Sequence, residues 1–337
     1  MRFVANLDPG ASPNLPVEIV KPSRGKILVI RGGAIGDFIL TLPAIAALRQ
    51  HFPDAYLEVL GYPHIAQLAV AGGLADRVES IGSRALAGFF ARRGELAEEL
   101  VDYFSEFDLI ISYLYDPDQI FSTNVARCTR AQFITGSHRP NDQMTIHATR
   151  LYLKPLERLA IFDADPVPRL RMSGDAALVA RLFPREEGQG LGPTLALHPG
   201  SGGERKNWPE EKWAELLQHL INSTSFNVLL VGGEAEGERL QRLSATLPPA
   251  RVRVAQSRPL PELAQILQRC AAFVGHDSGI AHLAAAVGLP GLILWGDTVE
   301  EVWRPPSEKM IVLRHMAGLT ALPVSEVLEQ IRRLRMP

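Results

Sequence analysis

With 337 residues, the chain is longer than one hydrophobic core usually allows, so its length predicts two domains with a cleft between them. Hydrophobic residues make up 46% of the chain and charged residues 21%, a composition typical of a soluble globular protein. The formal net charge of −2 argues against a general nucleic-acid binder, because such proteins carry a strong basic excess. Cys128 and Cys270 lack the spacing of a disulfide framework or a zinc site, which fits a reducing compartment.

The N-terminal residues lack the features of a signal peptide. Residues 1–25 hold four prolines and no continuous apolar core, so they predict an irregular extension. The most apolar stretch, from Ile27 to Leu48, is interrupted by charged residues, glycines and a proline, so it does not predict a membrane span. We therefore expect a cytoplasmic protein, and a peripheral position at the inner membrane is compatible with this expectation.

Short apolar runs rich in β-forming residues alternate with longer helical patterns. In the first half the order is "KILVI", "FILTLPAIAALRQHF", "YLEVL", "IAQLAVAGGL" and "FDLIISYL". From Pro193 it is "PTLALHPG", "WAELLQHLI", "FNVLLVGG", "ERLQRLSATL", "LPELAQILQRC", "AFVGHDSG", "IAHLAAAVG" and "GLILWG". Such alternation predicts parallel sheets with crossover helices, and hence an α/β fold made of two doubly wound halves.

The composition also predicts where these halves are divided. The stretch from Lys154 to Gly192 holds several prolines and glycines with weak periodicity, which is typical of a domain boundary. We predict an extension over residues 1–25, an N-terminal domain over 26–165, a linker region over 166–192, a C-terminal domain over 193–322 and a final helix within 323–337.

The first loop of interest follows the strand "KILVI", because ligands of open α/β sheets bind beyond the carboxyl ends of the strands. This loop, "RGGAIGD", carries Gly32, Gly33 and Gly36 before a helix that we expect to begin at residue 38 or 39. The glycine spacing matches neither the dinucleotide fingerprint nor the P-loop, which disfavours a nicotinamide cofactor. Asp37 has two compatible interpretations, namely an acid at the start of a helix and a general base at the mouth of the cleft.

The second half repeats this arrangement in "HPGSGGERKNWPEE". Ser201, Gly202 and Gly203 offer hydroxyl and amide donors, and Lys206 adds a positive charge shortly before a helix announced by Pro209. Together these groups can hold a diphosphate. Taken alone, Lys206 also fits a solvated surface lysine.

A third loop, "GHDSGIAHL", follows the apolar run "AFVG". We expect Asp277 to cap the helix that follows, and Ser278 and Gly279 to present hydroxyl and amide groups to a phosphate. A histidine on such an apolar helix is usually structural. The position of His282 above a donor-rich turn also fits a supporting or phosphate-contacting role.

With these loops in place, the chain resembles glycosyltransferase family 9, the ADP-heptose:lipopolysaccharide heptosyltransferases and their relatives. The resemblance runs from Lys26 onward and rests on "ILVIRGGAIGDFILTLPAIAALRQHFPDA", "HPGSGGERKNWPEEKWAEL", "VGGEAEGERLQRL" and "GHDSGIAHLAAAVGLPGLILWGDT", followed by "VWRPP". It implies the GT-B architecture, in which two Rossmann-like domains face a cleft. The acceptor would lie mostly on the first domain and the nucleotide-sugar on the second.

The resemblance also implies roles for individual residues. It makes Asp37 the catalytic base, and it gives Glu234 the contact with the ribose of the donor. It assigns the donor diphosphate to two loops, which contain Ser201, Gly202, Lys206, Asp277, Ser278, Gly279 and His282. The acceptor side of the first loop would hold Arg31, Gly32, Gly33 and Gly36. Gly32, Gly33 and Ala34 stand where the family commonly carries serines.

The implied reaction is an inverting, metal-independent transfer of a sugar, with heptose from ADP-heptose as the expected donor pair. The acceptor would be the lipopolysaccharide core or a related glycan or glycolipid at the cytosolic membrane face, and no cofactor is expected. Two Asp-x-Asp pairs, at residues 116/118 and 163/165, resemble metal sites of other transferases, but such pairs are frequent by chance. An acceptor role stays open for Asp116 and Asp118. Arg127, Arg130 and Arg139 could bind an anionic acceptor or form solvated surface.

Two other functions are compatible with these motifs. A nucleotide-sugar 2-epimerase shares the two-domain architecture and the diphosphate loop, although it needs further acid and base residues around the sugar. A nonenzymatic nucleotide-sugar-binding module would keep the donor loops without the acceptor chemistry. The presence of Asp37 counts against the second alternative.

Overall fold

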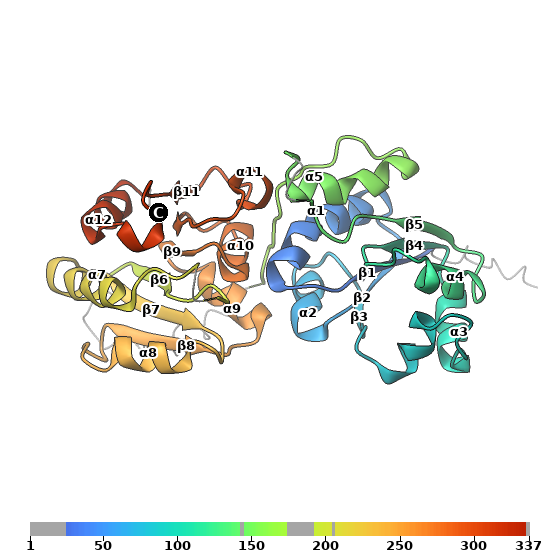
Figure 1. Ribbon diagram of the computed structural model, residues 1–337, viewed down its shortest axis with the longest axis horizontal. Helices are drawn as coiled ribbons and strands as arrows, with labels where there is room; N and C mark the ends of the chain where they lie inside the picture. The colour runs from blue at the N-terminus through green and yellow to red at the C-terminus, as the bar shows by residue number, and fades with distance from the viewer. Residues whose placement is uncertain (1–24, 142–144, 174–191, 204–205, 335–337) are drawn as a thin grey trace, which may run out of the picture.

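The computed structural model describes residues 25–141, 145–173, 192–203 and 206–334. Two parallel β-sheets with helices on both faces lie side by side, one in each half of the chain (Figure 1). All but one residue of the predicted N-terminal extension, and most of the predicted linker region, lie outside the described residues. The prediction of two doubly wound α/β halves is confirmed.

The first sheet has the strand order β3-β2-β1-β4-β5. Its strands are β1 (Lys26–Arg31), β2 (Tyr56–Gly61), β3 (Arg77–Ser80), β4 (Leu109–Ser112) and β5 (Gln132–Thr135). Its helices are α1 (Ile35–His51), α2 (Pro63–Ala71), η1 (Arg84–Phe90), α3 (Glu98–Ser105), α4 (Ile120–Ala126), α5 (Ala148–Leu153) and η2 (Lys154–Leu159). Alternate residues of β1 enter different cores, with Ile27 under α1 and α2, and Leu28 under α3 and α4. Burial on both faces explains why this strand reads as a continuous apolar run.

The second sheet has the strand order β11-β10-β9-β6-β7-β8. Its strands are β6 (Thr194–His198), β7 (Asn227–Gly232), β8 (Val252–Gln256), β9 (Ala272–His276), β10 (Gly291–Leu294) and β11 (Met310–Leu313). Its helices are α7 (Glu210–Ser223), α8 (Gly237–Ser244), α9 (Leu260–Leu267), α10 (Gly279–Ala286), α11 (Glu300–Trp303), η4 (Leu319–Ala321) and α12 (Val324–Arg333). Within the described ranges, no helix combines the length and apolar character needed to cross a membrane.

The strands that the sequence pattern did not predict are the four at the sheet edges, β3, β5, β8 and β11. Edge strands are short and partly exposed, so they carry polar residues, as in "RVES" and "QFIT". The sequences of β3 and β5 therefore lack the apolar run that marks the interior strands, whereas β11, "MIVL", is an apolar run that the sequence analysis did not include.

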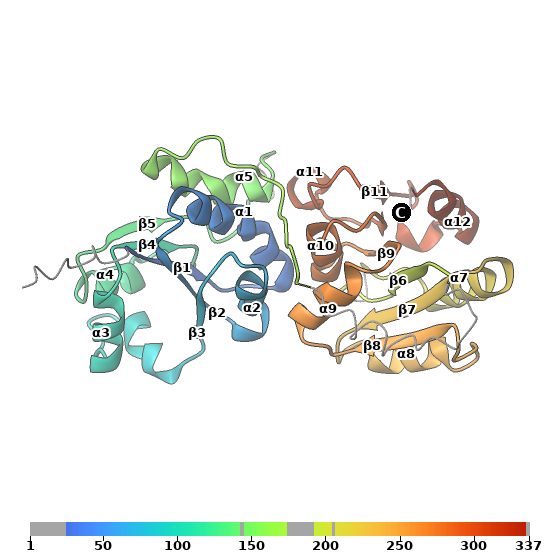
Figure 2. The ribbon, with the colours of Figure 1, turned by 180° about the vertical axis from the view of Figure 1, so that it is seen from behind.

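Each sheet has a crevice where its strand order reverses, and this crevice faces the other half of the chain. The strand order reverses between β1 and β4 in the first sheet and between β6 and β9 in the second, and ligands of such sheets bind at the carboxyl ends of these strands. Helices α1 and α10, which follow β1 and β9, pack against each other across the boundary, as do α2 and α9 (Figures 1 and 2). The two crevices therefore share one space.

Candidate active site

A cavity of about 280 Å³ lies where the two crevices meet. Its wall combines residues of both sheets: Ala34, Gly36, Asp37, Leu40, Arg139, Ser201, Lys206, Asp277, Ser278, Gly279, His282, Thr298 and Trp303. The predicted base and most of the predicted diphosphate residues are thus brought together. Among the other predicted residues, the wall does not include Arg31, Gly32, Gly33, Gly202 or Glu234.

The N-terminal ends of α1 and α10 touch at this cavity through two glycines. A Cβ atom on Gly279 would lie 2.7 Å from Ile35 Cβ and 3.1 Å from the backbone nitrogen of Gly36. A Cβ atom on Gly36 would lie 3.2 Å from His282 Cδ2. The absence of side chains lets the two helices approach, so their positive N-terminal ends favour an anion at the same place.

Ser278, rather than Asp277, caps α10. Ser278 has extended backbone angles, and its Oγ accepts a hydrogen bond of 3.3 Å from the amide of Ala281. The predicted cap at Asp277 was therefore wrong. The Asp277 carboxylate instead accepts hydrogen bonds from Lys206 Nζ at 3.1 Å and from Thr298 Oγ1 at 2.7 Å. It holds the ammonium group of Lys206 at the cavity wall.

The described residues of the loop that carries Lys206 make polar contacts with one another. The backbone amide of Lys206 donates to the carbonyl of Gly203, and Ser201 Oγ lies 2.7 Å from Asn207 Oδ1. The side chain of Lys206 is 43% exposed, whereas that of its partner Asp277 is only 11% exposed. Asp277 thus holds the Lys206 ammonium on its buried side, and the exposed side of the ammonium remains accessible to a ligand.

His276 lies at the end of β9, directly before the loop that carries Ser278, and its ring binds the loop that carries Ser201. Its Nδ1 donates to the carbonyl of Gly200 at 3.0 Å, and its Nε2 accepts from the amide of Trp208 at 2.8 Å. This pairing requires a neutral ring, and burial lowers the pKa of His276 to about 3. Burial likewise lowers the pKa of His282 to about 4, so the ring at the cavity is uncharged near neutral pH.

We expect the free energy of unfolding to fall between about pH 7 and pH 5. In this range the unfolded chain binds a proton that folded His276 excludes, so the stabilisation is present above the unfolded pKa and is lost below it. The loss from His276 alone is roughly 2 kcal/mol at pH 5. Urea unfolding at both pH values measures the change, and NMR should find the His276 ring neutral throughout. A ring that becomes protonated above pH 5 in the folded protein would contradict the prediction.

Asp37 lies in the first turn of α1, which begins at Ile35 rather than at residue 38 or 39. Its Oδ2 accepts a hydrogen bond of 3.2 Å from the amide of Ala34, and its Oδ1 lies 3.8 Å from a nitrogen of Arg31. The side chain stays 27% exposed and lines the cavity. The contact with the helix end therefore leaves Asp37 accessible to a substrate.

The remaining residues of the first loop lie behind or beside the cavity. Gly33 has a positive φ of 103°, and a Cβ there would approach Asp37 Oδ2 to 3.2 Å, so glycine suits this turn. Gly32 lies near Tyr62 and Leu114. Arg31 is 3% exposed, and its guanidinium donates a hydrogen bond to the backbone carbonyl of Asp37.

Glu234 lies in a neighbouring cavity of about 570 Å³. Both halves of the chain line it, with His64 and Gln67 on one side and the loops after β7 and β8 on the other. Ile35 and Ile280 also line this cavity, next to the two glycines of the first one. The contact between α1 and α10 therefore separates two adjoining spaces.

Thr298 and Trp303, on the cavity wall, were not predicted as site residues, and Arg139 was considered only for an anionic acceptor. Thr298 follows β10 and holds Asp277; its place after a strand end was the available signal. The guanidinium of Arg139 lies 5.4 Å from the ring centre of Trp303, across the boundary between the halves. That contact depends on how the halves pack, so no local pattern reveals it.

Arg127, which was also considered for an anionic acceptor, donates hydrogen bonds to the carbonyl of Gly94 and to Asn124 Oδ1.

The acidic pairs have local structural partners. Asp116 accepts hydrogen bonds from the amides of Phe121 and Ser122 at the start of α4, and Asp165 pairs with Arg169. In the part of the chain that the structure describes, no three or more His, Cys, Asp and Glu side chains form a group that could hold a metal ion.

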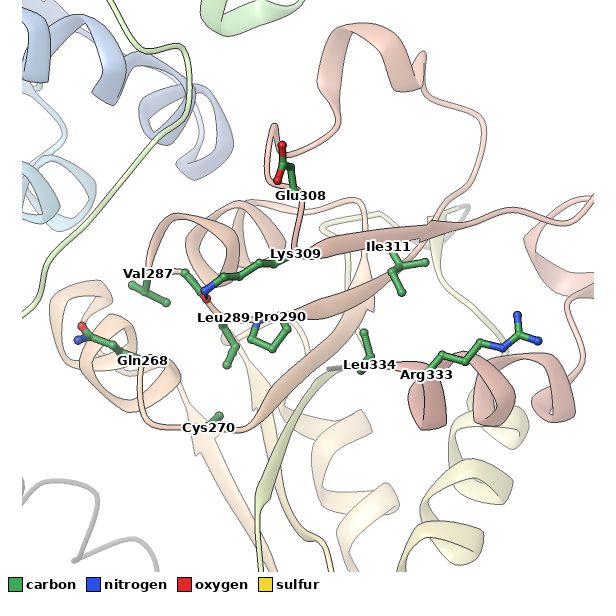
Figure 3. Close-up of a pocket in the computed structure, with 11 residues that line it drawn as sticks. Gln268, Cys270, Val287, Leu289, Pro290, Glu308, Lys309, Ile311, Arg333 and Leu334 are labelled. Carbon is green, nitrogen blue, oxygen red and sulfur yellow. Dashed lines mark hydrogen bonds between the residues drawn. The ribbon is translucent and has the colours of Figure 1, made fainter. Parts of the chain in front are cut away.

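A larger cavity of about 620 Å³ lies at the opposite ends of strands β9 to β11 (Figure 3). Cys270, Pro290 and Lys309, each just before one of these strands, contribute to its wall. It contains none of the residues predicted to act on a substrate. Because ligands of such sheets bind at the carboxyl ends of the strands, this cavity is not the candidate active site.

Comparisons with known proteins agree with these motifs. A family model described as glycosyltransferase family 9 (heptosyltransferase) matches residues 165–323. Lipopolysaccharide heptosyltransferase 3 of Escherichia coli is 24% identical over 300 residues, covering 82% of this chain and 85% of that protein. Lipooligosaccharide heptosyltransferase 2 of Haemophilus influenzae is 32% identical over 173 residues, 48% of this chain and 50% of that protein.

A solved structure shares the fold over nearly the whole chain. The structure of E. coli ADP-heptose lipopolysaccharide heptosyltransferase II superposes with a TM-score of 0.72 at 20% identity, covering 92% of this chain and 98% of that one. This likeness confirms the predicted GT-B architecture of two sheets facing a cleft. The match of residues 165–323 to the family model, together with relatives whose similarity extends over 82% of the chain, supports a glycosyltransferase of family 9.

Proposed function

We propose that the chain transfers a heptosyl group from ADP-heptose to a saccharide of the lipopolysaccharide core, with inversion and without a metal ion. The observation that carries this proposal is the shared cavity, in which a carboxylate of the first half faces Lys206 and a helix N-terminus of the second half. The names of the similar proteins, which include ADP-heptose and lipopolysaccharide, support the choice of donor and acceptor.

In this proposal the donor diphosphate binds at the N-terminal end of α10. Ser278 and Gly279 present backbone amides there, and Lys206 supplies a positive charge that Asp277 holds in place. The nucleoside end occupies the neighbouring cavity, where Glu234 accepts a hydrogen bond from a ribose hydroxyl. The heptosyl end then lies toward Asp37.

Asp37 acts as the general base. Its carboxylate takes the proton from the attacking acceptor hydroxyl while the new bond to the anomeric carbon forms. The bond from that carbon to the phosphate oxygen breaks on the opposite face of the sugar, and ADP leaves. Lys206 and the helix ends stabilise the negative charge that develops on the diphosphate, so these groups supply the stabilisation that a metal ion gives in other transferases.

The acceptor approaches from the side of the first half, where Arg139 is exposed at the cavity. A guanidinium at this place suits a phosphate or carboxylate on the acceptor saccharide. A glycan or glycolipid of the lipopolysaccharide core, at the cytosolic membrane face, is therefore the proposed acceptor.

Lys206→Ala is expected to weaken ADP binding by roughly 1 to 3 kcal/mol, because a charge-assisted hydrogen bond to the diphosphate is lost. Isothermal titration calorimetry measures the difference. Lys212→Ala is the matched control, since that lysine donates to the carbonyls of Thr320 and Leu322 outside the cavity. Equal ADP affinity for wild type and Lys206→Ala would remove Lys206 from the proposed phosphate site.

A thermal-shift screen of nucleoside diphosphates and nucleotide-sugars tests the proposed donor, because a ligand that binds only the folded state raises its stability. ADP and ADP-heptose should raise the melting temperature more than their uridine and guanosine counterparts. Incubation of each bound nucleotide-sugar without an acceptor separates the transferase from an epimerase. Rapid isomerisation of the sugar would favour the epimerase.

A further inference from the structure

Arg31, at the carboxyl end of β1, is a charged side chain almost entirely removed from water. Only 3% of the residue is exposed. Its guanidinium lies 4.5 Å from the ring centre of Tyr152 and 5.9 Å from that of Tyr113. Burying a cation costs free energy unless good partners replace water, so each contact of this group matters to its place in the fold.

The guanidinium joins two segments that border the cavity. One terminal nitrogen donates to the backbone carbonyl of Asp37 at 3.2 Å and lies 3.8 Å from its carboxylate. The other donates to the carbonyl of His138 at 2.7 Å and lies 3.5 Å from that of Tyr113. The planar fork of arginine holds its two terminal nitrogens in a fixed geometry toward both sides, whereas the ammonium of lysine is a compact point charge without that fork.

Each of these segments carries a residue of the candidate active site. The first turn of α1 carries Asp37, and the residue after His138 is Arg139, whose guanidinium lies over Trp303 of the other half. Arg31 itself is absent from the cavity wall. Arg31 can therefore affect the cavity only indirectly, through its hydrogen bonds to the backbone at Asp37 and His138.

We propose that Arg31 is a positioning residue that fixes the direction of the Asp37 carboxylate relative to the acceptor-side segment at His138 and Arg139. The proposal rests on the proposed function, because it takes Asp37 to be the base. Arg31 contributes geometry to the transfer step and makes no contact with the donor. Its loss should therefore lower kcat and leave donor binding nearly unchanged.

The experiment compares Arg31→Gln, Arg31→Lys and Arg49→Gln in the full chain. Arg49 is the matched control, because it also binds backbone carbonyls, those of Leu74 and Ala55, but from the last turn of α1. Steady-state kinetics give kcat and the donor KM, calorimetry gives ADP affinity, and thermal unfolding confirms that each variant is folded.

Arg31→Gln should lower kcat by about 10- to 100-fold, as expected for a displaced catalytic group. Arg31→Lys, which keeps the charge and loses the fork, should recover part of that loss. The donor KM and ADP affinity should stay within about twofold of wild type in both variants, and Arg49→Gln should keep the wild-type kcat. If Arg31→Gln does not fold, Arg31→Lys still tests the proposal, since its kcat should lie below that of the wild type.

Wild-type kcat in a folded Arg31→Lys or Arg31→Gln variant would overturn the proposal. So would a loss of ADP affinity parallel to the loss of kcat, because that indicates a general disturbance of the fold. Asp37→Asn separates this failure from a failure of the proposed function. If Asp37→Asn turns over normally, the base is wrongly assigned; if it is inactive while both Arg31 variants are normal, only the positioning role is wrong.

Discussion

Asp37→Asn should reduce heptosyl transfer by about 10²- to 10⁴-fold while ADP affinity stays close to that of the wild type. A general base contributes a factor of this size, and an amide cannot take the proton from the acceptor hydroxyl. The amide oxygen can still accept the hydrogen bond from the amide of Ala34, so the start of α1 should be preserved. Single-turnover transfer rates and calorimetric ADP affinity check the two parts of the expectation.

The matched control is Asp116→Asn. Asp116 also accepts hydrogen bonds from backbone amides at the start of a helix, but it does not line the cavity. This variant should keep the wild-type kcat. If Asp37→Asn transfers heptose at a rate within about tenfold of the wild type, a positioned general base at this place is excluded.

Gly279→Ala should lower kcat/KM by about 100-fold or more and reduce the melting temperature. The new methyl group would lie 2.7 Å from Ile35 Cβ, where neither helix has a flexible side chain that can move away. Helices α1 and α10 would separate, which displaces Asp37 from the donor site, and displacements of about 1 Å can cost this much. Steady-state kinetics and thermal unfolding measure the two effects.

Gly296→Ala is the control for this substitution, because a Cβ at Gly296 has no heavy atom within 4 Å. Its kinetics and melting temperature should match those of the wild type. Wild-type kcat/KM in Gly279→Ala would show that the two halves tolerate separation at this contact, and would remove the basis for a tightly held cavity between them.

The start of α1 differs between the sequence prediction, residue 38 or 39, and the structure, Ile35. Glycine has a low helix propensity, so Gly36 predicts that the helix begins after it. In the structure the helix already includes Gly36, where the close approach of His282 and Gly279 leaves little room for a side chain. The glycine therefore meets a tertiary contact more than two hundred residues away along the sequence, and no local pattern contains that contact.

The same limit applies to the donor loops. Strand ends and glycine-rich turns predict that the loops at Ser201 and Ser278 border one cavity, and the structure shows that they do. Their internal pairing follows from packing: Asp277 and Ser278 are both plausible helix caps by residue type, and only the nearness of Lys206 and Thr298 to Asp277 decides between them. The sites assigned from the resemblance stay predictions until they are tested with substrates.

Acceptor-dependent release of ADP from ADP-heptose tests the central claim most directly. The purified chain is incubated with ADP-heptose, a chelator and lipopolysaccharide-core acceptors truncated to different lengths, and the glycan product is analysed by mass spectrometry and NMR. The proposal predicts that ADP appears only with an acceptor, that the product gains one heptosyl unit with inverted anomeric configuration, and that the chelator does not slow the reaction. Bound ADP-heptose that is never transferred to any such acceptor would contradict it.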